Sequence, residues 1–547
     1  MNIVNEGKWC RVEHASREEI ESIAKCLTFF EDEDVYDIDI DLDEELELTW
    51  EDKLDHFVFL QQVNGKFKFL SGLLPYFKDH YSGQFTVQTE YTAPVRWKVE
   101  IPEDYLDGIT FRGYQKHAVE KSLYFRKGIL HIPTRGGKTE VMIGIAKYYL
   151  ENINPSGKIL FVEPDGHLMG QTYKRCLKRG LKDVGRLGDG HRELDHSVLI
   201  CIVNSLYNIV KDPSHKDFNA IQETTAIIVD EVHHLGSPSM AQAPIVIPDI
   251  ELFIGVSGSP FNDEADPHTN PRDVAIIGLL HQVIMKVSPR YLMNKGYIGE
   301  PHVFIMGYGG GGYPRYFVKN YNKVYNKFLL WHSGRNAMIT QIAELFNDYE
   351  FNLLILVTRI DHGKFLLKRI NSFSPNALFA FGGGNVIRHY GGVLPDDLSD
   401  DEWDWYADKE DKKKGNKYIG LKGDQGKLID EHFEGDEPNI LIGSTVFDEG
   451  VDLPTVDALI IAGGQGRSDV KNIQRPARAL TRNDGRNYVY IIDFWDDRHK
   501  YLKKHSKLRI DAYKKNQYYI HTGGVDELEE SIKETVRIEN EIRKGKK

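Results

Sequence analysis

The chain lacks the features of a membrane protein and of a disulfide-rich secreted protein. In its 547 residues there is no run of about 18 apolar residues, the length that spans a bilayer. The first residues, MNIVNEGKWCRVEH, contain no apolar signal region. Only four cysteines occur, at positions 10, 26, 176 and 201, and they form no CxxC pair, which excludes a disulfide scaffold and a cysteine-based zinc site. We therefore expect no membrane contact and a cytoplasmic location.

The chain also lacks the positive charge that is usual in proteins that bind nucleic acid, since its net charge is −13. Residues 31–55 and 396–411, however, carry net charges of −13 and −8, so the rest of the chain has a net charge of +8. The local field matters more than the total charge. A basic groove therefore stays compatible with this composition, and both acidic segments are typical of solvated surface.

Hydrophobic residues make up 41% of the chain, enough for several packed cores, and at roughly 150 residues per domain the length predicts three or four domains. Residues 1–95 are predicted to form a small α+β domain. It has a helical pattern at 16–30, an alternating strand pattern with an acidic face at 37–42, and a hairpin whose strands, 57–60 and 66–70, flank the Asn64-Gly65 turn signal.

Short apolar runs alternate with amphipathic stretches in the rest of the chain, which is typical of buried parallel strands separated by helices. We predict two tandem doubly wound parallel-sheet α/β domains, at 96–299 and 300–520, joined near 296–301. An acidic insertion at about 382–420 is predicted to be a surface loop. The tail, 521–547, is predicted to be an amphipathic helix with a basic end, which either docks on the body or contacts nucleic acid. The apolar runs lie at 128–132, 158–162, 198–203, 226–229, 252–256, 353–357, 377–381, 440–442, 458–461 and 488–492.

A glycine-rich segment follows the first of these runs and precedes a predicted helix at 140–150, the context that a phosphate-binding loop requires. Glycines let backbone N–H groups surround a phosphate, and the helix N-terminus adds a favourable dipole. Lys138 is predicted to reach the β- and γ-phosphates of ATP, and the Thr139 hydroxyl to bind Mg²⁺. The alternative is an ordinary glycine turn, since Ile132 stands where the usual pattern has its first glycine. The predicted loop runs Pro133-Thr134-Arg135-Gly136-Gly137-Lys138-Thr139.

An acidic segment, Asp230-Glu231-Val232-His233-His234, directly follows the run 226–229. A carboxylate at the C-terminal end of a parallel strand points to the crevice where ligands bind. Asp230 is predicted to hold Mg²⁺ through water, and Glu231 to polarise the attacking water. The alternative is an acidic helix start beside a histidine pair.

Together with four further segments in the same order, these motifs resemble those of superfamily 2 helicases, over residues 108 to 500. The resemblance implies two RecA-like domains that bind ATP and Mg²⁺ between them. It assigns adenine recognition to Arg112 and Gln115, loop contacts to Thr134, Gly136 and Gly137, and the DExH form of motif II to Asp230, Glu231 and His233. It also assigns motif III to Ser257 and Ser259, motif V to Thr445, Gly450 and Asp452, and motif VI to Gln474 and Arg478.

Motif VI departs from the usual pattern. Ala477 stands where glycine is common, Thr481 stands where the second arginine is common, and Arg482 comes one place late. Arg478 is therefore the better candidate for the arginine that stabilises transition-state charge, with Arg482 as a second candidate. In isolation, arginines at this spacing are also typical of a solvated helix face.

Further segments resemble the parts of the family that touch nucleic-acid phosphates. They place Pro164, Gln171, Ser205, Thr358 and Thr445 along a groove, which predicts binding with little sequence preference and a strong dependence on salt.

Within the superfamily, the chain looks most like the phage UvsW-type recombination helicases, relatives of the XPB and RecG groups. That resemblance implies ATP-driven remodelling of branched DNA, with the N-terminal domain binding duplex DNA or, through its acidic face, a protein partner. The alternatives are an RNA helicase, the motor of a restriction or defence nuclease, and an ATP-gated clamp. No nuclease cluster is evident, because Asp493, Asp496, Asp497 and His499 are better interpreted as a helix start.

Overall fold

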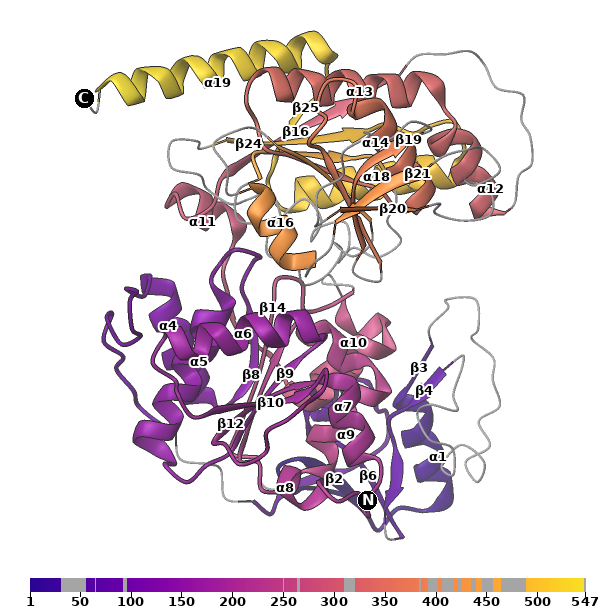
Figure 1. The fold of residues 1–547 in the computed structure, drawn as a ribbon. Helices are drawn as coiled ribbons and strands as arrows, with labels where there is room; N and C mark the ends of the chain where they lie inside the picture. The colour runs from indigo at the N-terminus through magenta and orange to yellow at the C-terminus, as the bar shows by residue number, and fades with distance from the viewer. Residues whose placement is uncertain are drawn as a thin grey trace. The chain divides into compact units, whose positions relative to one another are not determined.

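The computed structural model describes most of the chain, in fourteen segments. Those residues fall into two compact units, one made of Met1–Pro133 and Gly137–Val287 and the other containing Ser288–Lys547, and each is described by itself (Figure 1). Within them, no helix combines the length and apolar character needed to cross a membrane. The described residues are 1–30, 56–63, 65–91, 96–248, 250–262, 266–308, 320–382, 385–391, 402–405, 417–421, 425–433, 439–444, 456–463 and 488–545.

Unit 1 begins with a five-stranded sheet in the order β5-β6-β2-β1-β7. Helix α1 (Arg17–Cys26) is shorter than the predicted 16–30, and it begins after Ser16, whose side chain forms a capping box with Glu19. Helix α3 (Leu74–His80) lies between β6 and β7 in the chain. The strands are β1 (Asn2–Asn5), β2 (Trp9–Glu13), β5 (Gln61–Val63), β6 (Lys66–Leu70) and β7 (Thr86–Thr89), with β3 (Thr28–Phe30) and β4 (His56–Val58) forming a separate pair.

In the predicted N-terminal hairpin, the strand after the turn was predicted correctly, whereas its partner strand was not. Strand β6 pairs with β5, which lies directly before the turn, whereas β4 pairs with β3 instead. The short Gln61–Val63 segment has a polar composition that hides it from a hydrophobic pattern. The predicted strand at 37–42 lies outside the described residues.

The core sheet of unit 1 has the order β11-β10-β12-β9-β13-β14-β8-β15, and every neighbouring pair except β10 and β11 is parallel. Strands occupy all five positions predicted there. The strands are β8 (Lys127–His131), β9 (Ile159–Glu163), β10 (Val184–Gly188), β11 (His191–Arg192), β12 (Val198–Ile202), β13 (Ala226–Asp230), β14 (Leu252–Ser257) and β15 (Val283–Lys286). The main helices are α4 (Gly113–Phe125), α5 (Lys138–Tyr148), α6 (Gly166–Lys178), α7 (Val203–Val210), α8 (Phe218–Gln222), α9 (Pro238–Val246) and α10 (Pro271–Leu280).

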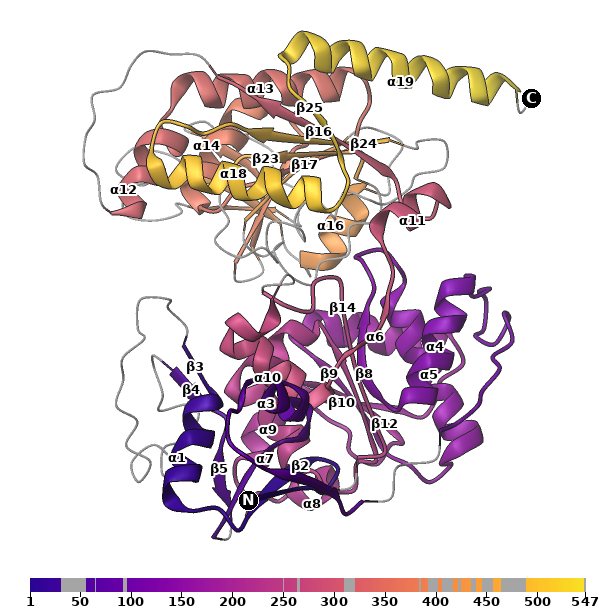
Figure 2. The ribbon, with the colours of Figure 1, turned by 180° about the vertical axis from the view of Figure 1, so that it is seen from behind.

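The N-terminal sheet shares a hydrophobic core with the core sheet of unit 1. Leu70 and Leu73 belong to the same buried cluster as Ile277 on α10 and Val229 on β13. Gly72 approaches α10 so closely that a Cβ there would lie 2.1 Å from the carbonyl oxygen of Ile277. Figures 1 and 2 show this N-terminal part, in indigo, beside α7, α9 and α10.

Unit 2 contains a ten-stranded sheet in the order β20-β21-β19-β18-β22-β17-β23-β24-β16-β25. All five predicted positions carry strands, so the α/β fold class with parallel sheets is confirmed. The strands are β16 (Glu300–Met306), β17 (Leu353–Leu356), β18 (Leu378–Phe381), β19 (Asn385–Gly391), β20 (Glu402–Trp405), β21 (Lys417–Leu421), β22 (Ile440–Gly443), β23 (Ala458–Ile461), β24 (Tyr488–Phe494) and β25 (Tyr519–His521). The helices are α11 (Pro289–Asn294), α12 (Tyr321–Tyr325), α13 (Ser333–Asp348), α14 (Ile360–Ile370), α16 (Gln425–Phe433), α18 (Lys500–Lys515) and α19 (Val525–Gly545).

Two predictions for unit 2 are wrong in part. The insertion at about 382–420, predicted as a surface loop, supplies the antiparallel strands β19, β20 and β21, which extend the sheet. The joining segment near 296–301 overlaps β16, because Glu300 and Pro301 pair with β24. The tail forms α19 as predicted, and it docks on unit 2 through Leu528 and Ile532, which are fully buried in the core.

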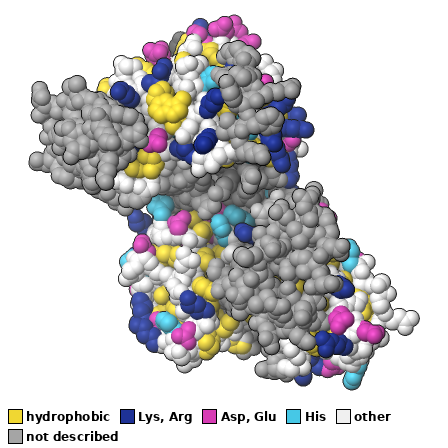
Figure 3. All heavy atoms as spheres, turned by 90° about the vertical axis from the view of Figure 1, so that its right-hand side faces the viewer, with side chains coloured by type: hydrophobic (Ala, Val, Ile, Leu, Met, Phe, Trp, Pro, Cys, Tyr) yellow, Lys and Arg dark blue, Asp and Glu magenta, His cyan; other side chains and the backbone are white. Residues whose placement is uncertain are grey.

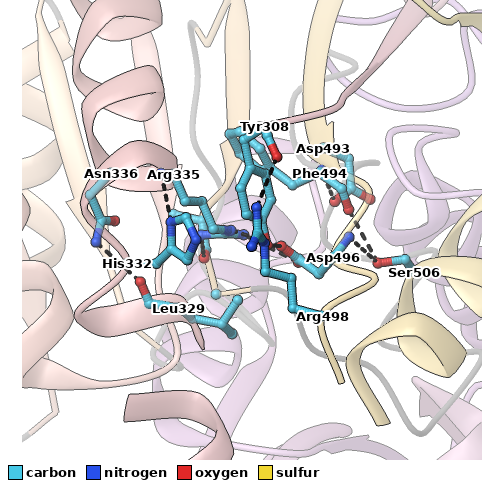
Figure 4. Close-up of polar contacts among 12 residues, drawn as sticks. Tyr308, Leu329, His332, Arg335, Asn336, Asp493, Phe494, Asp496, Arg498 and Ser506 are labelled. Atoms are coloured by element: carbon cyan, nitrogen blue, oxygen red, sulfur yellow. Dashed lines mark hydrogen bonds and ion pairs between the residues drawn. The ribbon is translucent and has the colours of Figure 1, made fainter. Parts of the chain in front are cut away.

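The acidic cluster after β24 is a buried ion-pair network (Figure 4). Asp496 accepts hydrogen bonds from Arg335 Nε at 2.9 Å and from the Tyr308 hydroxyl at 2.6 Å, and Asp493 accepts one from Arg509 Nε at 2.8 Å. His499 caps the N-terminus of α18, accepting from the Tyr501 N–H at 3.3 Å. These carboxylates are therefore held by arginines within the fold.

Candidate nucleotide-binding site

The phosphate-binding loop lies where the sequence predicts it, between the end of β8 at His131 and the start of α5 at Lys138. Gly137 precedes the helix with φ +73°, in the left-handed region, and a Cβ there would lie 2.2 Å from Gln115 Nε2. Both the backbone conformation and the space favour glycine. Ile132, in place of the usual first glycine, is fully buried.

Lys138 joins this loop to the acidic segment. Its ammonium group forms an ion pair with Glu231 Oε1 and lies 3.8 Å from Asp230 Oδ1. Asp230 is the last residue of β13, and the Glu231 backbone has φ +46°, a conformation that is uncommon for a non-glycine residue. The two motifs that the sequence predicted to share ATP are therefore in direct contact.

The last residue of β14, Ser257, holds the other oxygen of Glu231. The Ser257 hydroxyl donates a hydrogen bond to Glu231 Oε2 at 3.0 Å, and Ser257 Oγ accepts one from the backbone N–H of Ser259 at 3.1 Å. His233 Nδ1 lies 3.4 Å from Glu231 Oε2 and 3.3 Å from Ser257 Oγ. Glu231 is thereby connected to Lys138, Ser257 and His233 at once.

The surroundings shift the pKa values of Glu231, Asp230 and His233 in different directions. Burial opposes charge on Glu231, but Lys138, His233 and the Ser257 hydroxyl outweigh it and lower its pKa to about 2. Burial raises the pKa of Asp230 above its usual value although Lys138 opposes that change. Burial also lowers the pKa of His233 to about 4, so its imidazole is neutral near pH 7.

The predicted adenine-recognition residues lie beside the loop. Gln115, on α4, is buried, and its Oε1 accepts a hydrogen bond from the Arg112 backbone N–H at 2.9 Å. Gln115 Nε2 lies 3.5 Å from the Gly137 carbonyl oxygen. Arg112 Nη1 donates to the Tyr114 hydroxyl at 3.2 Å. Gln115 therefore connects the start of α4 to the phosphate-binding loop.

Sequence reasoning missed Glu163 as part of this region. It is fully buried at the end of β9, next to β13, and accepts a hydrogen bond from the Thr172 hydroxyl at 2.7 Å. Burial, followed by the charge of Asp230, raises the pKa of Glu163 well above its usual value. The available signal was a charged residue directly after an apolar run, the same signal that identified Asp230.

The predicted nucleic-acid residues that the structure describes lie in both units. Pro164 follows β9 and Ser205 lies on α7 after β12; because β9 and β12 are parallel neighbours, both lie at the sheet edge that carries Asp230. Gln171 lies on α6, where its Nε2 is 3.0 Å from Nε2 of His167. Thr358, in unit 2, donates to the Gly463 carbonyl oxygen at 3.4 Å. Figure 3 shows both basic and acidic side chains among the described residues on this face.

Six predicted residues lie outside the described part of the chain. They are Thr445, Gly450, Asp452, Gln474, Arg478 and Arg482. Their roles stay predictions from the sequence.

Known proteins resemble this chain over the region that contains these motifs. Residues 108–261 match the family described as "Type III restriction enzyme, res subunit". The "DNA 3'-5' translocase XPB2" of Sulfurisphaera tokodaii is 22% identical over 71% of this chain and 84% of its own length. The "ATP-dependent DNA helicase uvsW" of Enterobacteria phage T4 is 25% identical over 47% of this chain and 50% of its own length.

Among solved structures, the crystal structure of T4 UvsW aligns with 96% of this chain and 99% of its own, at 17% identity and a TM-score of 0.39. The sequence matches carry the conclusion. They confirm the predicted resemblance to superfamily 2 helicases, with UvsW among the relatives, and they support an ATP-dependent activity on nucleic acid.

Proposed function

We propose that this protein is an ATP-dependent DNA helicase or translocase that remodels branched DNA, by fork regression, branch migration or unwinding of D-loops or R-loops, in the cytoplasm. The observation that carries the proposal is the network in which Lys138 and Ser257 hold opposite oxygens of Glu231. It links the phosphate-binding loop to the segments expected to hydrolyse ATP and to sense hydrolysis. The choice of DNA is supported by relatives named as a DNA translocase and a DNA helicase.

The contacts of Lys138 suggest how nucleotide binding activates Glu231. ATP phosphates attract the Lys138 ammonium group, which would then leave Glu231 Oε1. Without that cation the pKa of Glu231 rises, so the carboxylate becomes a better base toward the attacking water. Ser257 keeps the second carboxylate oxygen in place.

The residues present fit the Mg²⁺ that such an activity requires. Thr139 supplies a hydroxyl and Asp230 a carboxylate, the oxygen donors that Mg²⁺ prefers. Burial raises the pKa of Asp230, and a nearby cation would favour its charged form. A bound Mg²⁺ would neutralise charge on the phosphates of ATP.

The remaining roles follow the sequence motifs. Gln474 and Arg478, with Arg482 as second candidate, would contact the γ-phosphate. Pro164, Gln171, Ser205, Thr358 and Thr445 would contact phosphates of the nucleic acid, whose binding then weakens as salt rises.

Mg²⁺-dependent ATP hydrolysis is the direct test. It would be measured without nucleic acid and with single-stranded DNA, duplex DNA, a four-way junction or RNA, at two salt concentrations. Strong stimulation by duplex or junction DNA that fades at high salt is expected. Stimulation by RNA alone would contradict the DNA assignment. Equal hydrolysis in all reactions would contradict gating by nucleic acid and direct attention to a protein partner of the acidic N-terminal region.

A further inference from the structure

Unit 1 contains a pocket of about 720 Å³ between its N-terminal sheet and its core sheet. The wall includes Lys8 from the turn before β2, Lys127 from the start of β8, and His281 after α10. Since β8 begins at Lys127 and leads at its other end to the phosphate-binding loop, the pocket lies at the opposite edge of the sheet from the candidate nucleotide site. It is therefore a separate cavity.

The pocket wall carries more positive than negative charge. Four cations line it, Lys8, Arg96, Arg126 and Lys127, against the two carboxylates Glu6 and Glu251 among the described residues; Asp249 lies outside them.

Both described carboxylates already have partners away from Lys127. Glu6 accepts hydrogen bonds from Arg11 at 2.7 Å and from Lys68 at 2.8 Å. Glu251 accepts one from the Tyr149 hydroxyl at 2.6 Å. Glu251 also acts on the charge of Arg126, whose Nε donates to the Glu251 backbone carbonyl at 3.1 Å, so it offsets part of the positive charge on this wall.

Lys127 occupies an unusual position for a lysine, because it lies near two other basic side chains, His281 and Lys8. Its Nζ lies 3.1 Å from His281 Nε2, which also lies 3.1 Å from Ser71 Oγ. Burial lowers the pKa of His281 to about 3, so its imidazole is neutral near pH 7. Burial, and then the charge of Lys8, lower the pKa of Lys127 to about 8. Lys8 itself donates to the carbonyl oxygens of Ile245 and Ile247, at 2.6 and 2.8 Å. An anion in the pocket would be attracted by these cations.

Aromatic side chains lie next to these cations. Tyr91 and Phe125, both in the wall, are exposed aromatic residues. Arg96 donates to the Tyr124 hydroxyl at 2.7 Å, and the Arg126 guanidinium lies 4.0 Å from the ring centre of Trp97. Aromatic faces stack on nucleobases, and cations bind the phosphates that accompany them. The pocket also has the size of small-molecule sites in proteins, roughly 300–1,000 Å³.

We propose that this pocket binds a phosphate-bearing ligand, a free nucleotide or the backbone of a nucleic-acid strand, with Lys127 as the principal cation and His281 as the group that positions its ammonium. The site is independent of the phosphate-binding loop and does not depend on the function proposed above.

Calorimetric titration of the full chain tests this inference. The Lys138→Ala variant, which removes the phosphate-contacting lysine of the first site, would be titrated with ADP and separately with an oligothymidylate. Adding Lys127→Met is expected to weaken binding of at least one probe by about tenfold or more, because a charge-assisted contact to phosphate is lost. Lys127→Arg, which keeps the charge, is expected to restore most of the affinity.

The matched control is Lys158→Met in the same background. Lys158 belongs neither to the pocket wall nor to the phosphate-binding loop, and it pairs with Glu223. It should leave both affinities unchanged. Competition between the probes then identifies the source of the phosphate: displacement of ADP by the oligonucleotide indicates the strand backbone, and a response of ADP alone indicates a free nucleotide. If Lys127→Met changes neither affinity while the melting temperature is preserved, or if Lys127→Arg fails to restore a lost one, the proposal is wrong.

Discussion

Glu231 has its two carboxylate oxygens held by groups from different parts of the chain, Lys138 on one side and Ser257 on the other. Replacing it with glutamine keeps the size of the side chain and removes the base. We expect Glu231→Gln to retain ATP binding and to lower kcat by about 100- to 10,000-fold, the usual contribution of a positioned general base. Steady-state hydrolysis and equilibrium binding of a fluorescent ATP analogue measure the two quantities separately.

The control at this scale is Glu223→Gln, which changes a surface glutamate paired with Lys158. It should keep normal turnover. Normal turnover in Glu231→Gln would remove Glu231 from its proposed role, and loss of ATP binding in that variant would mean that its carboxylate mainly holds the loop.

Several residues predicted for the nucleotide site, though not Arg112 and Gln115 at the start of α4, could be found from the sequence because each lies at or soon after the end of a buried strand. Asp230 and Ser257 end apolar runs on neighbouring parallel strands, so their meeting at one sheet edge follows from topology. The sequence did not show that Lys138 pairs with Glu231, since that contact depends on side-chain geometry. The pairing of Lys127 with His281 was equally invisible, because residues 154 positions apart meet only through the fold.

At the scale of elements, the start of α5 depends on a residue that tolerates a left-handed conformation. Gly137 has φ +73° and faces Gln115. We expect Gly137→Ala to lower the free energy of unfolding by about 1–2 kcal/mol, through the cost of the left-handed backbone, and to weaken ATP binding. Urea unfolding and nucleotide titration measure these effects.

Gly170, inside α6, provides the matched substitution. A Cβ there meets no atom within 4 Å, so Gly170→Ala should stabilise the protein by about 0.5–1 kcal/mol through helix propensity. Equal effects of the two alanines would show that the backbone conformation of Gly137 is not required.

Helix α19 is held to unit 2 by its apolar face, which is one of the two alternatives that the sequence left open. Ile532 is fully buried in the core of unit 2, so Ile532→Ala is expected to cost about 2–5 kcal/mol. Lys533→Ala, one residue further on the exposed face, should change stability by less than about 0.5 kcal/mol. Chemical denaturation followed by far-UV circular dichroism compares them, and equal stabilities would contradict docking of the helix.

Elements with a strong apolar run were predicted well, and polar or marginal strands were not. All ten predicted core strands are present, whereas β5, with the sequence Gln-Gln-Val, has no hydrophobic pattern. Strands β20 and β21 lie in or beside the acidic insertion. Its high charge favoured the prediction of a loop over the extension of the sheet that the structure shows. Such strands are stabilised by pairing with a neighbour already in place, and that long-range information is absent from a local pattern.

For the whole molecule, buried histidines predict a loss of stability in acid. Burial lowers the pKa of His362 and His281 to about 3, and that of His233, His302 and His432 to about 4. In the unfolded chain these groups titrate near 6.5. Between about pH 6.5 and 4 the unfolded state therefore binds more protons than the folded state, so the free energy of unfolding falls as the pH is lowered.

His362 offers the clearest single test of this effect. Its Nε2 lies 3.0 Å from Asn336 Oδ1 and must donate, so its Nδ1 accepts from the Tyr325 hydroxyl at 2.9 Å; protonation would destroy the second bond. One fully buried histidine of this kind contributes about 2 kcal/mol of destabilisation between pH 7 and 5. His362→Gln should be less stable than the original protein at pH 7 but lose less stability on going to pH 5, as measured by urea unfolding at both values. An unchanged pH dependence in this variant would mean that His362 is already protonated in the folded state or that other groups dominate the acid response.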